Sequence, residues 1–347
     1  MKELPGIALE PVSRFFASEV PGGDAPLAFE LIAGGRSNLT YRVRVRGEGR
    51  DWVLRRPPLG HVLPTAHDMA REFRVLSALR DTKVPVPRTV ALCTDTEVNG
   101  APFYVMEYCP GVILHEDLPE GFAETESERG GIARAMIETL VELHRVDYEA
   151  VGLGEFGRPD GFLARQVRRW SQQWERSKTR ELPAIDALID LLNRNLPESP
   201  PASIVHGDYR LGNMALDVDV PDRIVAIFDW EMATLGDPLT DLGYALMYWA
   251  EPGDPPNPLT FGAREPYTLR AGFPNRQELV DAYARASGRD LSGIAFYQAL
   301  AFYKLAVIAE GIYARFLKGK TVGEGFDDGG KSAEILVERG LERALAL

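Results

Sequence analysis

The hydrophobic period of the chain changes near residue 110, and this change restricts the possible folds more than any single motif does. Apolar residues alternate with arginines from Tyr41 to Arg46, within a run that extends over residues 29–54. A two-residue period is typical of a half-buried strand, so this run predicts a β-hairpin that ends before Pro57. After Gly111 the apolar residues recur at helical spacing. The chain is therefore expected to be α+β, with a sheet-rich segment before a helical one.

Each segment contains further predicted elements. In the first segment, helical spacing predicts one main helix over Thr65–Leu79, and the runs "VPVPRTVALCTD" and "PFYVMEYCPG" predict more strands of a mostly antiparallel sheet. The many Pro and Gly residues between Glu251 and Pro274 indicate a surface excursion without regular structure. The boundary is expected at Cys109-Pro110-Gly111. The sequence thus predicts a lobe of residues 1–108 and a helical lobe of residues 109–347, with helices over 132–143, 161–176, 182–196, 277–286 and 294–317.

Charge and composition narrow the expected partners and compartment. The chain has 39 Lys and Arg residues against 51 Asp and Glu residues, a net charge of −12, which disfavours nucleic acid or an anionic membrane as the main partner. Two cysteines, Cys93 and Cys109, are too few for a disulfide scaffold, and the N-terminus lacks an export-signal pattern, so a cytoplasmic protein is expected. The longest apolar run, 294–317, predicts a buried helix and not a membrane span, because it is interrupted by Gln298, Lys304, Glu310 and Arg315.

The stretch "HGDYRLGN", residues 206–213, carries the residues best suited to chemistry. Asp208 and Asn213 are five residues apart, and the next strand-like run, "RIVAIFDWE", contains a second acid, Asp229, near its end. Two carboxylates and a carboxamide from neighbouring loops would form an oxygen-rich cage, which suits Mg²⁺ bridged to substrate phosphates. The pattern therefore predicts phosphoryl transfer. The alternative interpretation is that Asp208 and Asn213 only cap a turn.

"HGDYRLGN" followed by "IFDWE" resembles the signature of the aminoglycoside phosphotransferase and choline kinase group, relatives of the protein kinases. The stretches "VLRRPP", "REFRVLSAL", "PVPR", "FYVMEYCPG" and "ATLGDPLTDLGY" are more closely similar to the kinase-like proteins found alone in bacteria or fused to acyl-CoA dehydrogenases in animals. The resemblance covers about residues 29–316. It implies a bilobal protein-kinase-like fold, with ATP and Mg²⁺ as cofactors.

The resemblance also implies roles for individual residues. Asp208 would be the catalytic residue that orients the acceptor hydroxyl and takes its proton, and Asn213 and Asp229 would hold the metal. Arg55 stands where protein kinases have a lysine, and Glu72 would be its ion-pair partner. The nucleotide would contact "AGGRSNLTY", which lacks the G-x-G-x-x-G order, and the hinge "FYVMEYCPG"; the residues expected there are Gly35, Ser37, Asn38, Met106, Glu107 and Cys109.

Several neighbouring polar residues are expected to be structural. His206 is interpreted as an anchor for its loop, and His144 and Asp147 as packing and capping residues at a helix end. Asp241 is expected to cap the following helix and to accept hydrogen bonds from the backbone of the catalytic loop.

These observations favour an ATP- and Mg²⁺-dependent O-phosphotransferase that acts on a small-molecule hydroxyl. The acceptor implied by the resemblance is a hydroxyacyl compound or its CoA ester, or an aminoglycoside-like alcohol. One alternative is a catalytically silent kinase-like module that only binds nucleotide. A metallophosphoesterase is disfavoured because that chemistry normally needs clustered histidines, whereas this chain has scattered ones at His61, His67, His115, His144 and His206.

Overall fold

The chain folds into two compact units in the computed structural model. The structure describes residues 4–33, 38–47, 49–59, 67–115, 117–255, 265–319 and 329–347. The first unit consists of Met1–Pro110 and Ala226–Ala233, and the second of Gly111–Val225 and Thr234–Leu347. Among the described residues, no helix is long and apolar enough to cross a membrane.

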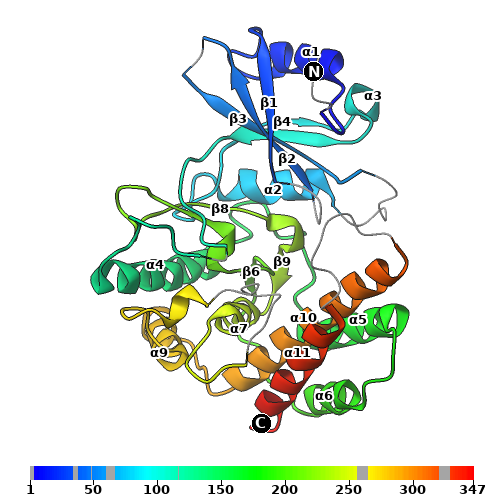
Figure 1. Ribbon diagram of the computed structural model, residues 1–347, viewed down its shortest axis with the longest axis vertical. Helices are drawn as coiled ribbons and strands as arrows, with labels where there is room; N and C mark the ends of the chain where they lie inside the picture. Colours follow the sequence, from blue (N-terminus) through cyan, green and yellow to red (C-terminus); the bar gives the residue numbers. More distant parts are fainter. Residues whose placement is uncertain are drawn as a thin grey trace. The chain divides into compact units, whose positions relative to one another are not determined.

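The first unit is built on a five-stranded antiparallel sheet with the strand order β1-β2-β3-β5-β4 (Figure 1). Tyr41 of β2 lies opposite Leu31 of β1 and Leu54 of β3, in agreement with the predicted two-residue period. The strands are β1 (Leu27–Ala33), β2 (Leu39–Val45), β3 (Asp51–Arg56), β4 (Thr89–Cys93) and β5 (Phe103–Glu107).

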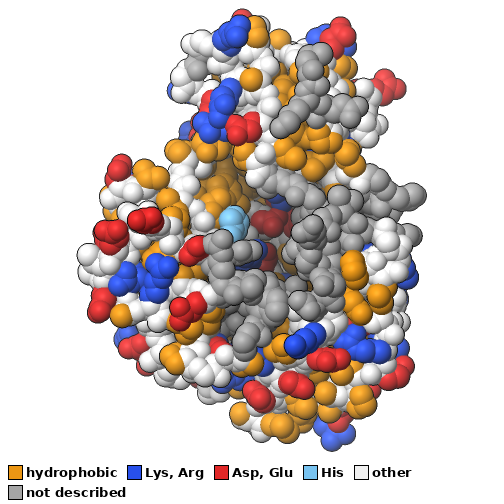
Figure 2. Space-filling model, in the orientation of Figure 1, with side chains coloured by type: hydrophobic (Ala, Val, Ile, Leu, Met, Phe, Trp, Pro, Cys, Tyr) orange, Lys and Arg blue, Asp and Glu red, His pale blue; other side chains and the backbone are white. Residues whose placement is uncertain are grey.

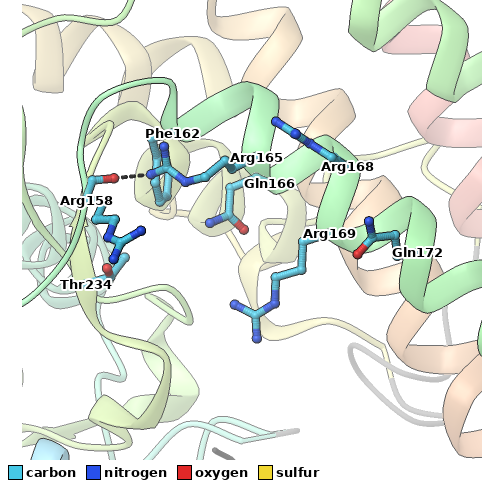
Figure 3. Close-up of a pocket in the computed structure, with 8 residues that line it drawn as sticks. All are labelled: Arg158, Phe162, Arg165, Gln166, Arg168, Arg169, Gln172 and Thr234. Atoms are coloured by element: carbon cyan, nitrogen blue, oxygen red, sulfur yellow. Dashed lines mark hydrogen bonds between the residues drawn. The ribbon is translucent and has the colours of Figure 1, made fainter.

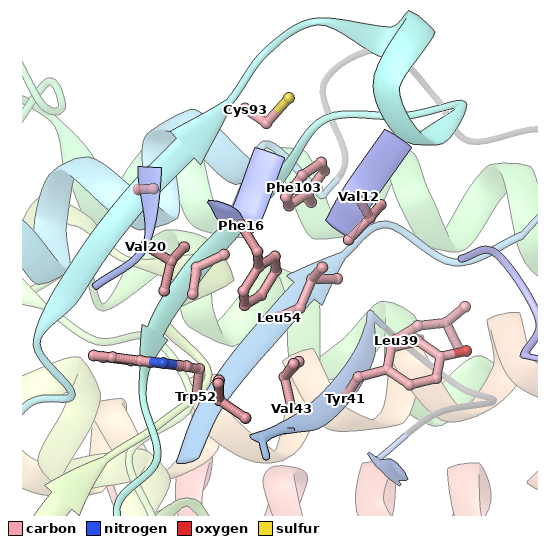
Figure 4. Close-up of a cluster of buried hydrophobic side chains, with 13 residues drawn as sticks. Val12, Phe16, Val20, Leu39, Tyr41, Val43, Trp52, Leu54, Cys93 and Phe103 are labelled. Carbon is pink, nitrogen blue, oxygen red and sulfur yellow. The ribbon is translucent and has the colours of Figure 1, made fainter. Parts of the chain in front are cut away.

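One face of this sheet packs against α1 (Leu9–Glu19). Val12 and Phe16 of α1 are fully buried against sheet residues that include Leu54 and Phe103 (Figure 4). Helix α1 was not predicted; the sequence indicated only α2 as the main helix of this part of the chain. The short helix α3 (Thr96–Asn99) lies beside α1, and the Asn99 side chain accepts a hydrogen bond from the Ala8 backbone N–H at 2.8 Å.

The opposite face of the sheet packs against α2 (Met69–Leu79), through contacts such as the edge-to-face pair of Phe73 and Tyr104. The sequence predicted that this helix begins at Thr65, but it begins at Met69. The Asp68 side chain accepts a hydrogen bond from the Arg71 backbone N–H at 3.0 Å, which satisfies a first-turn donor and fixes the start. Because adjacent strand residues point to opposite faces, Arg55 and Tyr104 lie on the α2 side.

The second unit consists mainly of helices (Figure 1). The five predicted helices are present, and α10 spans the predicted residues Ile294–Leu317 and packs against α5, α7 and α11. Helix α11 was not predicted, and α7 was expected only as a helix following Asp241, whereas it begins at Leu239. The helices are α4 (Glu126–Arg145), α5 (Phe162–Ser177), α6 (Pro183–Arg194), α7 (Leu239–Tyr248), α9 (Arg276–Ser287), α10 and α11 (Gly329–Ala344). Figure 2 shows acidic and basic side chains intermixed over the face of this unit that is in view.

Short strands hold the segment that contains "HGDYRLGN". Strand β6 (Ser203–Val205) pairs antiparallel with β9 (Thr234–Gly236), and β7 (Met214–Leu216) pairs with β8 (Ile224–Ile227). Residues 206–213 connect β6 to β7 and end in a single 3₁₀ turn, η1 (Leu211–Asn213); a second turn, η2 (Trp230–Met232), follows β8. The excursion at residues 251–274 contains one 3₁₀ turn, η3 (Tyr267–Leu269), where no regular structure was expected; residues 256–264 lie outside the described part. The predicted α+β class is confirmed.

Candidate active site

The loop between β6 and β7 holds Asp208 and Asn213 together. The Asn213 side-chain amide donates hydrogen bonds to the Asp208 carboxylate Oδ2 at 2.7 Å and to the Asp208 backbone carbonyl at 2.8 Å. The Asp208 backbone N–H donates to Nδ1 of His206 at 3.1 Å, and His206 is completely buried. These bonds fix the Asp208 carboxylate relative to the Asn213 amide, so the spacing of five residues serves a definite local geometry.

Asp241 holds the backbone of the same loop. Its completely buried carboxylate accepts hydrogen bonds from the backbone N–H groups of His206 at 2.7 Å and Gly207 at 2.8 Å, as predicted. Burial alone would raise the pKa of Asp241, but hydrogen bonds from His144 and Gly207 hold it below its ordinary value. The predicted cap is wrong: Asp237, not Asp241, accepts a hydrogen bond from the Leu239 backbone N–H at the start of α7, at 3.0 Å.

His144 and Asp147, which were expected to be structural residues, make packing and turn-closing contacts. The ring of His144 is buried between Tyr283, whose hydroxyl lies 2.7 Å from Nδ1, and Asp241, whose carboxylate lies 3.4 Å from Nε2. Asp147 accepts hydrogen bonds from the backbone N–H groups of Glu149 and Ala150, both at 3.1 Å. His144 therefore links α4 to the support of the catalytic loop, and Asp147 closes a turn.

Lys304 is a site residue that the sequence interpretation missed. This partly buried lysine of α10 donates a hydrogen bond from Nζ to the carbonyl of Gly207, and Nζ lies 4.1 Å from the centre of the Tyr244 ring. Burial lowers the pKa of Lys304 to about 8, although the carboxylates of Asp208 and Asp241 act in the opposite direction. A cation therefore lies next to Asp208. In the sequence it was visible only as an interruption of an apolar helix.

A second basic residue also contacts this loop. Nε of Arg210 lies 3.5 Å from Oδ1 of Asp208, and its guanidinium stacks over the Tyr248 ring at 5.0 Å. The carboxylate of Asp208 is thus flanked by an amide and two basic side chains.

The first unit contains a second group of predicted site residues, centred on Arg55. Nε of Arg55 lies 3.0 Å from Oε2 of Glu72, Nη2 lies 2.5 Å from Oδ1 of Asp229, and Nη1 lies 3.2 Å from the Thr40 hydroxyl. Burial would lower the pKa of Arg55, but the carboxylates of Glu72 and Asp229 and their neighbours raise it above its ordinary value. Arg55 therefore keeps its charge and joins β3, α2 and the end of β8.

Asp229 has an unusual backbone conformation. Its φ of 67° and ψ of 55° are left-handed, a region that most side chains avoid but that Asp tolerates better than branched residues. The conformation ends β8 abruptly and lets η2 begin at the next residue. Asp229 is thereby presented at a sharp turn, where its carboxylate meets Arg55.

Of the predicted nucleotide-contacting residues, Met106 and Glu107 lie at the end of the inner strand β5, Cys109 follows it, and Asn38 directly precedes β2. Met106 is buried in β5, and the backbone N–H of Glu107 already donates to the carbonyl of Arg88 at 2.8 Å. Cys109 is partly buried, which raises the pKa of its thiol to about 11. The Asn38 side chain donates to Glu231 at 3.1 Å, whereas Gly35 and Ser37 lie outside the described residues. Their nucleotide contacts stay a prediction.

The donor set for a metal can be tested against the residues present. The nitrogen of the Asn213 amide is used by Asp208, so the amide presents its oxygen as a ligand, and Asp229 supplies a carboxylate; both oxygen types suit Mg²⁺. Over the described ranges, no group of three or more His, Cys, Asp and Glu side chains is placed to hold a metal. Asn213 belongs to the second unit and Asp229 to the first, so their convergence on one cation stays a prediction.

Comparison with known proteins places this chain in a family. Residues 28–297 match the family described as "Phosphotransferase enzyme family". The chain is 36% identical over 314 residues to acyl-CoA dehydrogenase family member 10 of Mus musculus. This match covers 90% of this chain and 29% of that protein. It is 33% identical over 322 residues to family member 11 of Homo sapiens, with coverage of 92% and 40%. The chain thus spans less than half the length of these relatives.

Solved structures show the same relationship. A Ralstonia eutropha protein, provisionally named an aminoglycoside phosphotransferase, superimposes with a TM-score of 0.81 at 34% identity, and the match covers 97% of this chain and 98% of that one. Choline kinase from Cryptosporidium parvum has a TM-score of 0.68 at 12% identity, with coverage of 97% and 96%, and indicates the fold alone. The predicted resemblance is confirmed: the chain belongs to the phosphotransferase enzyme family, with the kinase-like α+β fold of its small-molecule phosphotransferases.

Proposed function

We propose that the protein is a cytoplasmic, ATP- and Mg²⁺-dependent small-molecule kinase that transfers the γ-phosphoryl group to a substrate hydroxyl. The observation that carries this proposal is the fixed position of a carboxylate in the catalytic loop. Its carboxylate, Asp208, is positioned by Asn213 and His206, and the loop backbone is held by the buried Asp241. A merely structural turn would not need a partly exposed carboxylate, 17% accessible, fixed between an amide and two basic side chains.

The residues of both units have complementary roles in this reaction. Asp208 orients the acceptor hydroxyl and accepts its proton as the oxygen–phosphorus bond forms. Asn213 and Asp229 would hold Mg²⁺, which when bound neutralises charge on the transferred phosphoryl group. Arg55, fixed by Glu72, contributes a permanent positive charge for the nucleotide phosphates. The adenine edge would meet the backbone of Glu107 and Cys109 beside Met106, and the phosphates the loop of Gly35, Ser37 and Asn38.

The acceptor is proposed to be an alcohol. The names of the acyl-CoA dehydrogenase relatives favour a hydroxyacyl compound or its CoA ester, and the name of the Ralstonia protein favours an aminoglycoside-like alcohol. Catalytic loop and fold are compatible with both, because they act on the hydroxyl and the nucleotide and not on the rest of the acceptor.

A screen of hydroxyl compounds with ATP and Mg²⁺ tests the proposal. The set should contain hydroxy acids, their CoA esters, amino alcohols and aminoglycosides, and the readout is ADP release together with the mass of the product. We expect one class to gain a phosphoryl group in a Mg²⁺-dependent manner. Nucleotide binding without product from any class would instead favour the catalytically silent module.

Lys304 should make the reaction sensitive to pH. Because the pKa of Lys304 is about 8, its ammonium is charged below that pH and neutral above it, so kcat should fall as the pH rises through about 8. Lys304→Met should lower kcat at pH 7 by about tenfold or more, because the loop loses a cation next to Asp208, and should lack the fall near pH 8. A pH profile measured from 6.5 to 9.5 checks this. The same fall in the variant would assign that titration to another group.

A further inference from the structure

A cavity in the second unit lies apart from the catalytic loop and is lined by arginines (Figure 3). Its volume is about 440 Å³, a size typical of small-molecule sites, and it lies between the first turns of α5, the segment before α5, and Thr234 of β9. We call this cavity the arginine pocket; its lining includes Arg158, Arg165, Gln166, Arg168, Arg169 and Gln172.

The sequence of α5 explains why the arginines gather there. Arg165, Arg168, Arg169 and Gln172 are spaced at three and four residues, so they share one face of the helix. The other face is apolar and buried through Leu163, Val167, Trp170 and Trp174. Figure 3 shows Arg158, Gln166 and Arg169 extending into the open space between α5 and the segment before it.

Within the described part of the chain, no carboxylate is paired with the arginines of the pocket. Arg165 donates hydrogen bonds to the backbone carbonyls of Arg158 and Asp160, which fixes the segment before α5 but adds no counter-charge. Among the residues that the structure describes, no acidic side chain lines the pocket. Arg158, Arg168 and Arg169 are exposed, and like charges gathered at one cavity repel each other, although a protein with a net charge of −12 has many carboxylates with which to pair them. An anionic ligand would supply the missing charge.

The arginine pocket is linked to the catalytic loop through the paired strands β6 and β9. Thr234 in its wall pairs with Val205, the last residue of β6, and Asp208 follows three residues later. Paired strands lie about 5 Å apart and three residues span at most about 11 Å, so the Cα atoms of Thr234 and Asp208 are within about 16 Å.

Helix α10 provides a second connection. Arg169 is followed by Trp170, whose ring centre lies 6.0 Å from Nζ of Lys304, the residue that donates to Gly207. Both connections join elements that line the arginine pocket to elements that support the catalytic loop.

We propose that the arginine pocket binds the phosphate-bearing end of an acceptor whose hydroxyl group lies at Asp208. Guanidinium groups bind phosphate oxygens in a two-pronged geometry, and the cavity is large enough for more than a single carboxylate. The acceptor would thus be an organic phosphate that carries its anionic group at the end remote from the reacting hydroxyl. A polycationic aminoglycoside would be repelled by the same arginines. The assignment of the bound phosphate to the acceptor rests on the proposed phosphotransferase function. The anion site itself does not.

Titration calorimetry with inorganic pyrophosphate tests the anion site directly, in a buffer without Mg²⁺ or nucleotide. The wild-type protein should bind pyrophosphate, and added salt should weaken the binding. Arg158→Gln combined with Arg169→Gln should raise the dissociation constant at least about tenfold. Arg176→Gln, at an exposed position of α5 outside the pocket, is the matched control and should bind like wild type. Asp208→Asn should also bind like wild type, because this binding needs no catalysis.

Turnover measurements then distinguish a substrate phosphate from a separate anion. Matched pairs of hydroxyl acceptors, with and without a phosphate group, should differ in KM for the wild type, and the double arginine variant should lose most of this difference while keeping kcat. Equal pyrophosphate binding by wild type and the double variant, or an equal loss in Arg176→Gln, would overturn the anion site. Arginine-dependent binding without any preference among acceptors would overturn the substrate assignment. If no acceptor reacts but binding depends on the arginines, the kinase function fails and the anion site stands.

Discussion

Replacing Asp208 by Asn should lower kcat for phosphoryl transfer by about 10²- to 10⁴-fold, the usual contribution of a positioned general base. Asn keeps the size of the side chain and can still accept the hydrogen bond from the Asn213 amide, which in the native protein is 2.7 Å long. The variant loses the carboxylate that takes the proton from the acceptor. Because the change leaves the nucleotide contacts in the first unit intact, the KM for ATP should change by less than about threefold.

The measurement is steady-state turnover of the acceptor identified by the screen, with thermal melting to check the fold. Asp219→Asn is a suitable control, since it removes one carboxylate from the exposed turn between β7 and β8 of the same unit. It should react at the wild-type rate. An Asp208→Asn variant that is folded and retains wild-type kcat would show that Asp208 is not the base, and the proposed mechanism would then be wrong.

Strand β2 could be predicted because buried Tyr41, Val43 and Val45 alternate with more exposed arginines. Strands β3 and β5 are buried along nearly their whole length and were indicated by their apolar composition. Helix α1 could not be predicted, because its N-cap residue, Ala8, makes no side-chain cap and only Val12 and Phe16 of the helix are buried. Helix α7 was expected only as a helix following Asp241, and its range was not predicted for the opposite reason. It is buried on nearly all sides, so its sequence shows no polar face from which a helical period could be recognised.

The candidate site also contains residues that could be predicted from the sequence and residues that could not. The residues of "HGDYRLGN" are close in sequence, and their spacing alone indicated that Asp208 and Asn213 act together. Lys304 is 97 residues away from the carbonyl that it contacts, and the pattern of its own helix carries no information about the loop on which that helix packs. The same holds for the ion pair between Arg55 and Asp229, which are 174 residues apart. Pairing of Arg55 with Glu72 was expected only because both positions match the resemblance.

The arginine pocket was not predicted, although the spacing of the α5 arginines is visible in the sequence. Three of the four arginines of α5, Arg165, Arg168 and Arg169, are at helical spacing and would normally be interpreted as a solvated face. Only the fold adds Arg158 from the preceding segment and Thr234 from β9, and thereby turns that face into the wall of a cavity. The acidic net charge of the whole chain, used above to exclude polyanionic partners, therefore does not describe the local charge beside the catalytic loop.

Replacing Asp229 by Asn should raise the Mg²⁺ concentration needed for half-maximal turnover by about 100-fold or more. Loss of a group that only orients a metal ligand typically costs 10- to 100-fold in affinity or activity, and a direct carboxylate ligand should cost at least as much. Asn tolerates the left-handed backbone conformation of residue 229, at φ 67°, so the turn after β8 should be kept. Arg55 would lose one of its two carboxylate partners but keep Glu72 at 3.0 Å.

The comparison that decides this prediction is with Glu231→Gln, which removes a carboxylate from the same segment, one that accepts a hydrogen bond from Asn38. Both variants change the local charge by one, but only Asp229 is proposed to bind the metal, so only Asp229→Asn should shift the Mg²⁺ dependence strongly. The readouts are turnover against Mg²⁺ concentration and the Mg²⁺-dependent rise in melting temperature with nucleotide present. Similar shifts in both variants would indicate a general effect of charge near Arg55, and the assignment of Asp229 as a metal ligand would then have to be abandoned.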